Sequence, residues 1–187
     1  KEDVYRPAEI EAVPISPGKD REAVCVELAG LLREHAITLH ERHHSIDPVT
    51  DKRLSLGLIR MANIDPLVET AVAMCNTGAP DNVFLHLCVY HSQHPLLVRS
   101  GMEQVLDRML NRKDPLSMFQ QPEIRRALDE TEERNHLFVV MATPVAEVGR
   151  DHDYDWAVVE PSSMRSIIQL AGRVRRHRFD PCTIPNL

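Results

Sequence analysis

Near the end of the chain, one glutamine and two arginines recur at a spacing that suits the binding of phosphate. Gln169, Arg173 and Arg176 lie at positions i, i+4 and i+7 of a predicted helix, so their side chains share one face. Gly172 adds no side chain, which lets a neighbouring domain approach closely. Because a guanidinium is always charged and matches phosphate oxygens with two hydrogen bonds, we interpret this face as catalytic and aimed at a γ-phosphate held by another domain. The alternative is a solvated basic helix end that the helix dipole stabilises.

A second candidate site follows the apolar run at residues 137–142. Thr143 lies where the predicted strand becomes a loop, and a hydroxyl beside exposed backbone amides can bind a nucleic-acid phosphate. Gly149 permits a tight reversal of the chain that presents Asp151. An ordinary turn between strand and helix would explain the glycine but not the other residues. Since ligands gather at the carboxyl ends of parallel strands, this loop is expected to belong to the site.

These two segments are similar to motifs V and VI of superfamily 2 helicases, which lie in the second RecA-like domain. The full strings ATPVAEVGRDHDYDW and PSSMRSIIQLAGRVRRHR more closely resemble the CRISPR-associated helicase-nuclease of type I systems, in its type I-F form. The resemblance is specific over residues 137–178, moderate over residues 60–63 and 90–92, and weak before residue 54.

The resemblance implies a role for each matching residue. Thr143 would contact single-stranded DNA, and Asn63 and Ser92 are further candidates for DNA contacts. Asp151, with Gly149, would lie near the nucleotide sugar. The residues that would face the triphosphate are Gln169, Arg173 and Arg176, of which Arg176 would be the arginine finger. Two positions depart from the pattern of relatives: Val148 stands where many helicases have arginine before the glycine, and Gln93 stands where relatives often carry arginine.

The resemblance also implies a cofactor and partners. ATP with Mg²⁺ would be bound mainly by the first RecA-like domain of the same parent chain. The other partners would be single-stranded DNA and the CRISPR RNA-guided surveillance complex, with no membrane involved and a cytoplasmic location. Four widely separated cysteines and the lack of an apolar run long enough to cross a bilayer agree with this. The net charge of −6 excludes a protein that coats nucleic acid by bulk attraction.

The sequence lacks the other half of an ATP-hydrolysing site. No GxxxxGK[ST] loop occurs, since Gly18 and Lys19 are followed by Asp20, and no DExH box follows a strand. We therefore expect that the chain is part of an enzyme but that, by itself, it neither hydrolyses ATP nor unwinds DNA.

The elements that must position these residues follow from the hydrophobic pattern. Apolar runs alternate with helical stretches, which is typical of a parallel sheet flanked by helices. Strands are predicted at residues 54–61, 83–90, 137–142, 156–160 and 183–187, and helices at residues 20–44, 66–76, 98–109 and 123–128. The expected fold is therefore a three-layer α/β domain with a mainly parallel sheet, which the resemblance makes RecA-like. Its candidate core residues include Leu28, Leu32, Val98 and Met102.

The expected organisation has three parts. Residues 1–19, rich in proline, form a linker or lead-in; residues 20–50 form a helical lead-in segment; and residues 51–187 form the second RecA-like domain. Because the last expected strand begins just as the sequence stops, we expect a piece of a larger chain.

Three other functions are compatible with parts of the sequence. The chain could be a motor domain of a different superfamily 2 helicase that acts on RNA or DNA, or a non-catalytic module that docks a protein. A remote alternative is a zinc hydrolase, because His40-Glu41-Arg42-His43-His44 matches HExxH, which supplies two zinc ligands and a general base. No third ligand is evident.

Overall fold

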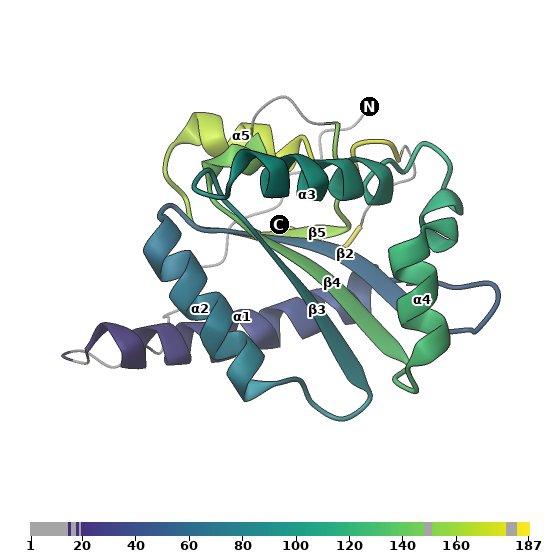
Figure 1. Cartoon of the computed structure of the whole chain (residues 1–187), viewed down its shortest axis with the longest axis horizontal. Coiled ribbons are helices and arrows are strands. Elements are labelled where there is room, and N and C mark those ends of the chain that lie inside the picture. Colours follow the sequence, from purple (N-terminus) through teal and green to yellow (C-terminus); the bar gives the residue numbers. More distant parts are fainter. Residues whose placement is uncertain (1–14, 16–17, 19, 148–150, 179–182) are drawn as a thin grey trace.

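Three long parallel strands form the body of the sheet in the computed structural model, which describes residues 15, 18, 20–147, 151–178 and 183–187. β2 (Arg53–Arg60) pairs with β4 (Asn135–Ala142), and β4 pairs with β3 (Val83–Tyr90). The other edge of β2 is shared by two short strands: β1 (Ser45–Ile46) is antiparallel to its start, and β5 (Trp156–Val159) is parallel to its end. The sheet is therefore mainly parallel (Figure 1).

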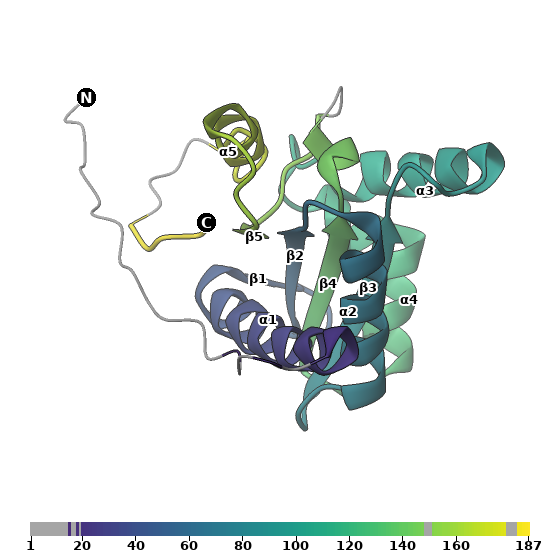
Figure 2. The ribbon, with the colours of Figure 1, turned by 90° about the vertical axis from the view of Figure 1, so that its left-hand side faces the viewer.

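Helices cover both faces of this sheet, as Figures 1 and 2 show. α1 (Arg21–His43) and α2 (Ile64–Thr77) pack on one face. The elements of the other face are α3 (Leu96–Met109), η1 (Ser117–Gln120), α4 (Pro122–Glu130), η2 (Pro144–Glu147) and α5 (Met164–Ala171). The predicted three-layer α/β fold is thus confirmed.

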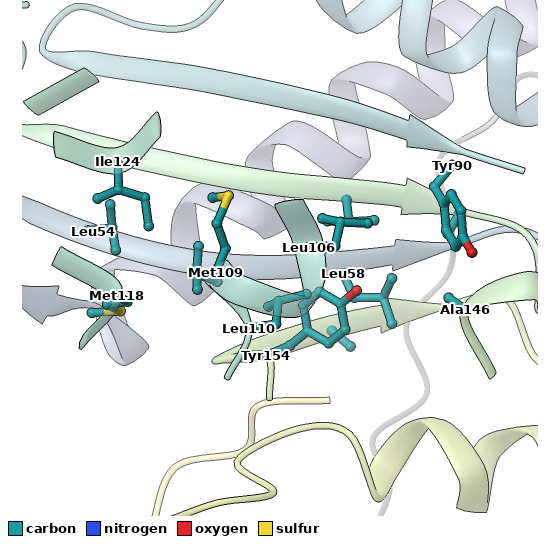
Figure 3. Packing of buried hydrophobic residues seen from close by; sticks show 14 of the residues in the cluster. Leu54, Leu58, Tyr90, Leu106, Met109, Leu110, Met118, Ile124, Ala146 and Tyr154 are labelled. Carbon is teal, nitrogen blue, oxygen red and sulfur yellow. The ribbon is translucent and has the colours of Figure 1, made fainter. Parts of the chain in front are cut away.

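Alternation along β2 divides its side chains between two hydrophobic clusters. Leu54, Leu56 and Leu58 point toward α3 and α4, whereas Ile59 points toward α1 and α2. Figure 3 shows the first cluster, in which the β2 leucines meet side chains at the end of α3 and Tyr154. A strand buried on both faces explains why the run at residues 54–61 is apolar almost throughout.

Gly57 of β2 leaves the space that the indole of Trp156 fills. The two residues are partners in the β2–β5 pairing, and Trp156 is fully buried against the cluster that holds α1. Its indole Nε1 donates a hydrogen bond to Ser55 Oγ at 3.1 Å. Through Trp156, α1 packs on the sheet as part of the helical layer, although the sequence suggested only a helical lead-in at residues 20–50.

Two expectations about the elements are wrong. Residues 183–187 form no strand: the Asn186 carbonyl accepts a hydrogen bond from Ala157 N at 2.9 Å, but Pro185 has no N–H with which to continue a ladder. Val98 is not a core residue but is 50% exposed, because the start of α3 extends past the edge of the sheet (Figure 2). Leu32 is buried, and Leu28 and Met102 are partly buried against the two clusters.

His40, the first histidine of the HExxH match, is part of the packing between α1 and the sheet, and both of its ring nitrogens have protein partners. It is 1% exposed, and its Nδ1 and Nε2 lie 2.8 Å from Ser55 Oγ and 3.3 Å from Asn135 Oδ1. Burial lowers its pKa to about 4, so the ring is neutral at pH 7. Within the described residues, no three histidine, cysteine or acidic side chains are placed to hold a metal ion.

The Gly57 site generates a stability prediction with an internal control. A Cβ at Gly57 would lie 2.1 Å from Trp156 Cζ2, so we expect Gly57→Ala to lower the free energy of unfolding by at least about 2 kcal/mol. Gly30→Ala, in the middle of α1 with open space around the new methyl, should instead raise it by about 0.5–1 kcal/mol. Urea denaturation of the two variants measures both values, and equal effects would contradict the packing described for Trp156.

The buried His40 predicts a loss of stability in mild acid. Since its folded pKa of about 4 lies below the ordinary value of 6.5, the unfolded chain binds more protons between these pH values, and stability falls as the pH falls from about 6.5 to about 4. Unfolding followed across this range should show a flatter dependence in His40→Gln than in the parent. His35→Gln, at an exposed position of α1, should retain the parent's dependence.

Candidate functional site

The carboxyl ends of the three long strands lie side by side, which brings three loops together. Arg60, Ala142 and Tyr90 are neighbours at the ends of β2, β4 and β3. The loops that follow form the walls of a cavity of about 660 Å³ that is open to solvent. It is lined by Ala62, Asn63, Ile64, Asp65, Ser92, Gln93, Thr143, Pro144 and Val145. The three residues predicted to contact DNA therefore share one surface, at the carboxyl ends of the parallel strands.

The three predicted DNA contacts differ in exposure. Thr143 is 5% exposed at the floor of the cavity, whereas Asn63 and Ser92 are exposed at its rim. Asn63 is the N-cap of α2 but makes no capping hydrogen bond with its side chain, and the amino end of that helix favours a bound anion. None of the nine lining residues is basic, and Asp65 is acidic. The cavity therefore offers neutral donors and a helix end rather than positive side chains.

The helix expected to carry Gln169, Arg173 and Arg176 on one face is shorter than predicted. α5 ends at Ala171, and Gly172 N donates to Ile168 O at 3.1 Å as the C-cap. Beyond it the chain continues in turns that lie beside Tyr154. Tyr154 N donates to Arg173 O at 2.8 Å, and Arg175 N donates to Tyr154 O at 2.9 Å. Arg175 adopts a positive φ of 53°. The prediction of a shared helical face is therefore wrong.

Arg173 points inward from this segment. It is 7% exposed, and its guanidinium NH2 donates to the backbone carbonyl of Glu147 at 2.7 Å. Burial, reinforced by the charge of Arg176, lowers its pKa from the ordinary arginine value. Gln169, by contrast, is exposed on α5. Arg173 thus joins the segment after α5 to η2, the short helix that follows Thr143.

Arg176 and Asp151 form an ion pair at the surface. Arg176 Nε lies 2.5 Å from Asp151 Oδ1, and the two side chains are 46% and 53% exposed. Hydrogen bonds from Arg176 and His177 lower the pKa of Asp151 to about 2, so its carboxylate is charged at pH 7. The predicted finger and the residue predicted to lie near the nucleotide sugar are therefore adjacent. Gly149 lies outside the described residues.

Sequence reasoning missed the acidic residues whose hydrogen bonds hold the segment that carries Arg176. Asp153 is buried, and its two carboxylate oxygens accept hydrogen bonds from Arg176 N and His177 N, both at 3.1 Å. Arg178 donates to Asp153 Oδ1 at 2.7 Å and to Asp155 Oδ1 at 2.5 Å. The repeated aspartates at alternate positions after Asp151 were visible in the sequence, but their arginine partners were not.

Comparison with known proteins shows the family of the chain. A family model described as "CRISPR-associated nuclease/helicase Cas3, C-terminal" matches residues 53–179. The chain is similar to the CRISPR-associated nuclease/helicase Cas3 of subtype I-F/YPEST from Pseudomonas aeruginosa strain UCBPP-PA14, with 57% identity over 163 residues. It is similar to the protein of the same description from Pectobacterium atrosepticum, with 50% identity over 174 residues. These matches cover 86% and 92% of this chain, but only 15% and 16% of the relatives.

Solved structures show the same fold at low sequence identity. The crystal structure of T. fusca Cas3-ATP matches with a TM-score of 0.53 and 16% identity over 80% of this chain and 14% of that one. The crystal structure of T. fusca Cas3-ADP matches with a TM-score of 0.55 and 16% identity over 88% and 15% of the two chains. No helix within the described residues has the length and apolar character that crossing a membrane requires.

Proposed function

The chain belongs to the family of CRISPR-associated nuclease/helicase Cas3 C-terminal regions, and from this premise we propose that it is the second motor domain of an ATP-dependent translocase on single-stranded DNA. It forms part of an enzyme of CRISPR interference in the cytoplasm. ATP with Mg²⁺ binds mainly to the first RecA-like domain of the parent chain. The T. fusca relatives of this fold, Cas3-ATP and Cas3-ADP, support a nucleotide in the parent protein.

The single observation that carries this proposal is the exposed pair of Arg176 and Asp151. The contact with the Asp151 carboxylate leaves the guanidinium at the surface, where a triphosphate on a facing domain can reach it. An ion pair as exposed as this contributes about 1 kcal/mol or less, so a phosphate group can displace the carboxylate at little cost. Arg176 then stabilises the charge of phosphoryl transfer, and Asp151 is released toward the nucleotide sugar.

Arg173 and Gln169 have secondary roles in this mechanism. Arg173 holds the Glu147 carbonyl and reaches the triphosphate only after that contact is released, so the finger role falls to Arg176. Gln169, exposed on α5, lies on the path by which the facing domain approaches. Both side chains act in the closed state, in which ATP lies between the two RecA-like domains.

Single-stranded DNA binds across the cavity formed by the three strand ends. The Thr143 hydroxyl and the amino end of α2, beside Asn63, contact backbone phosphates, while Ser92 contacts the strand from the opposite side. Closure on ATP and opening after hydrolysis move this grip relative to the grip of the first RecA-like domain, which gives directional stepping. The CRISPR RNA-guided surveillance complex supplies the strand on which the motor acts.

The finger assignment is tested by Arg176→Ala in the full-length parent protein. We expect ATP turnover to fall by about 10³-fold or more, with little change in nucleotide binding, because the arginine acts on the transition state. Steady-state turnover and binding of a fluorescent nucleotide measure the two quantities. Arg126→Ala, which removes an exposed arginine of α4, is the matched control and should leave both unchanged. Unchanged turnover in Arg176→Ala would rule out the motor role and favour a docking module.

The DNA cavity is tested by Thr143→Val, which removes the hydroxyl and keeps the shape. We expect affinity for single-stranded DNA to fall by about threefold to tenfold, as for the loss of one hydrogen bond. The slope of log affinity against log salt should not change, because a neutral hydroxyl releases no counterion. Fluorescence anisotropy at several salt concentrations measures both. Thr77→Val, at the far end of α2, should bind as the parent does. Equal affinities of the two variants would contradict the placement of DNA at this cavity.

A further inference from the structure

Arg60, the last residue of β2, lies beneath both proposed sites and contacts the elements of each. It is 1% exposed. Its guanidinium donates from Nε to Glu147 Oε1 at 2.9 Å, from NH1 to Glu160 O at 2.7 Å and from NH2 to Ser162 Oγ at 2.8 Å. One planar group therefore joins the end of η2 to the loop between β5 and α5.

Glu147 extends this connection to the segment after α5 that carries Arg173, Arg176 and Arg178, the arginine segment. The Oε1 atom that pairs with Arg60 also accepts a hydrogen bond from Ser166 Oγ of α5 at 2.5 Å. The backbone carbonyl of Glu147 accepts the bond from Arg173 at 2.7 Å. Since η2 begins directly after Thr143, a single turn of helix separates the proposed DNA contact from the residue that holds Arg173.

The same network reaches the other side of the DNA cavity. Glu160, whose carbonyl Arg60 holds, uses Oε2 to accept a hydrogen bond from Ala62 N at 2.7 Å, next to Asn63. Figure 1 shows that the start of α2 and α5 lie at the same end of the sheet. Both walls of the cavity are thus tied to Arg60, one through Glu147 and the other through Glu160.

A buried ion pair of this kind resists independent movement of the segments that it joins. Separating a buried charge from its partner is strongly unfavourable, so a displacement of η2 that broke its contact with Arg60 would be costly. Arg60 and Glu147 are 1% and 10% exposed, in contrast to the exposed pair of Arg176 and Asp151. A bound DNA strand that moves η2 through its contact with Thr143 therefore moves Arg173 and the arginine segment as well.

We infer that Arg60 and Glu147 are positioning residues that couple the binding of single-stranded DNA to the placement of the arginine segment at the nucleotide. This inference rests on the proposed function and specifies how its two sites communicate. Because coupling between two ligands is reciprocal, the pair transmits in both directions: DNA promotes the productive position of Arg176, and bound nucleotide tightens the grip on DNA.

The test uses the full-length parent protein and two variants. Glu147→Gln removes the charge and keeps the shape, and the double variant Arg60→Met/Glu147→Gln removes the pair without leaving a buried charge unmatched. ATP turnover is measured with and without single-stranded DNA, and DNA affinity is measured with and without a non-hydrolysable ATP analogue. We expect the stimulation of turnover by DNA to fall by about fivefold or more, and the analogue's effect on DNA affinity to fall as well.

A matched control variant separates coupling from folding. Asp47→Asn alters a buried carboxylate that pairs with Arg125 at 3.0 Å near the start of β2, remote from both sites, and should leave the stimulation unchanged. If the variants lose turnover equally with and without DNA, or keep the parent's stimulation, the pair is merely structural and the inference is overturned. A parent protein whose turnover does not respond to DNA would instead overturn the proposed function.

Discussion

A carboxylate with no access to water must be matched by donors from the protein, and Asp155 meets this constraint with three of them. Leu56 N donates at 2.7 Å, Arg112 at 2.8 Å and Arg178 at 2.5 Å. Burial alone would raise the pKa of Asp155, but the two arginine charges and the Leu56 amide outweigh it and lower the pKa. The loop after α3, the start of β5 and the end of the arginine segment are therefore held to β2, and Asp153 can cap the turn that carries Arg176.

Burial separates two kinds of ion pair that are built from the same side chains. Arg178 with Asp155, and Arg60 with Glu147, lie below the surface, where the loss of one partner leaves an unmatched charge. Arg176 with Asp151 lies in solvent, where exchange for a phosphate costs little. The buried, rigid ion pairs therefore support the exposed pair of Arg176 and Asp151, whose carboxylate can be exchanged for a phosphate. This division is what a domain requires if it must present an arginine to a nucleotide that it does not bind by itself.

The parallel arrangement of the sheet explains why the sites lie at one edge. β2, β4 and β3 run in the same direction and in register, so the loops after them meet, and β5 brings α5 to the same end. In the proposed mechanism, a link between the DNA and nucleotide sites then needs only short contacts. Arg60 would supply them, because the last residue of β2 is buried below both loops.

Local pattern determined the types of most elements and the fold class, and the resemblance of two motif strings indicated the family. Short continuous apolar runs, typical of strands buried on both faces, predicted β2, β3 and β4, and the position of Thr143 after β4 placed it at the carboxyl edge. Only the tertiary structure decided how the arginines are used. Helical spacing put Arg173 and Arg176 on one face, but backbone hydrogen bonds to Tyr154, about twenty residues earlier, end α5 at Ala171. Such contacts depend on which segments the folded chain brings together, and spacing along the sequence contains no information about them.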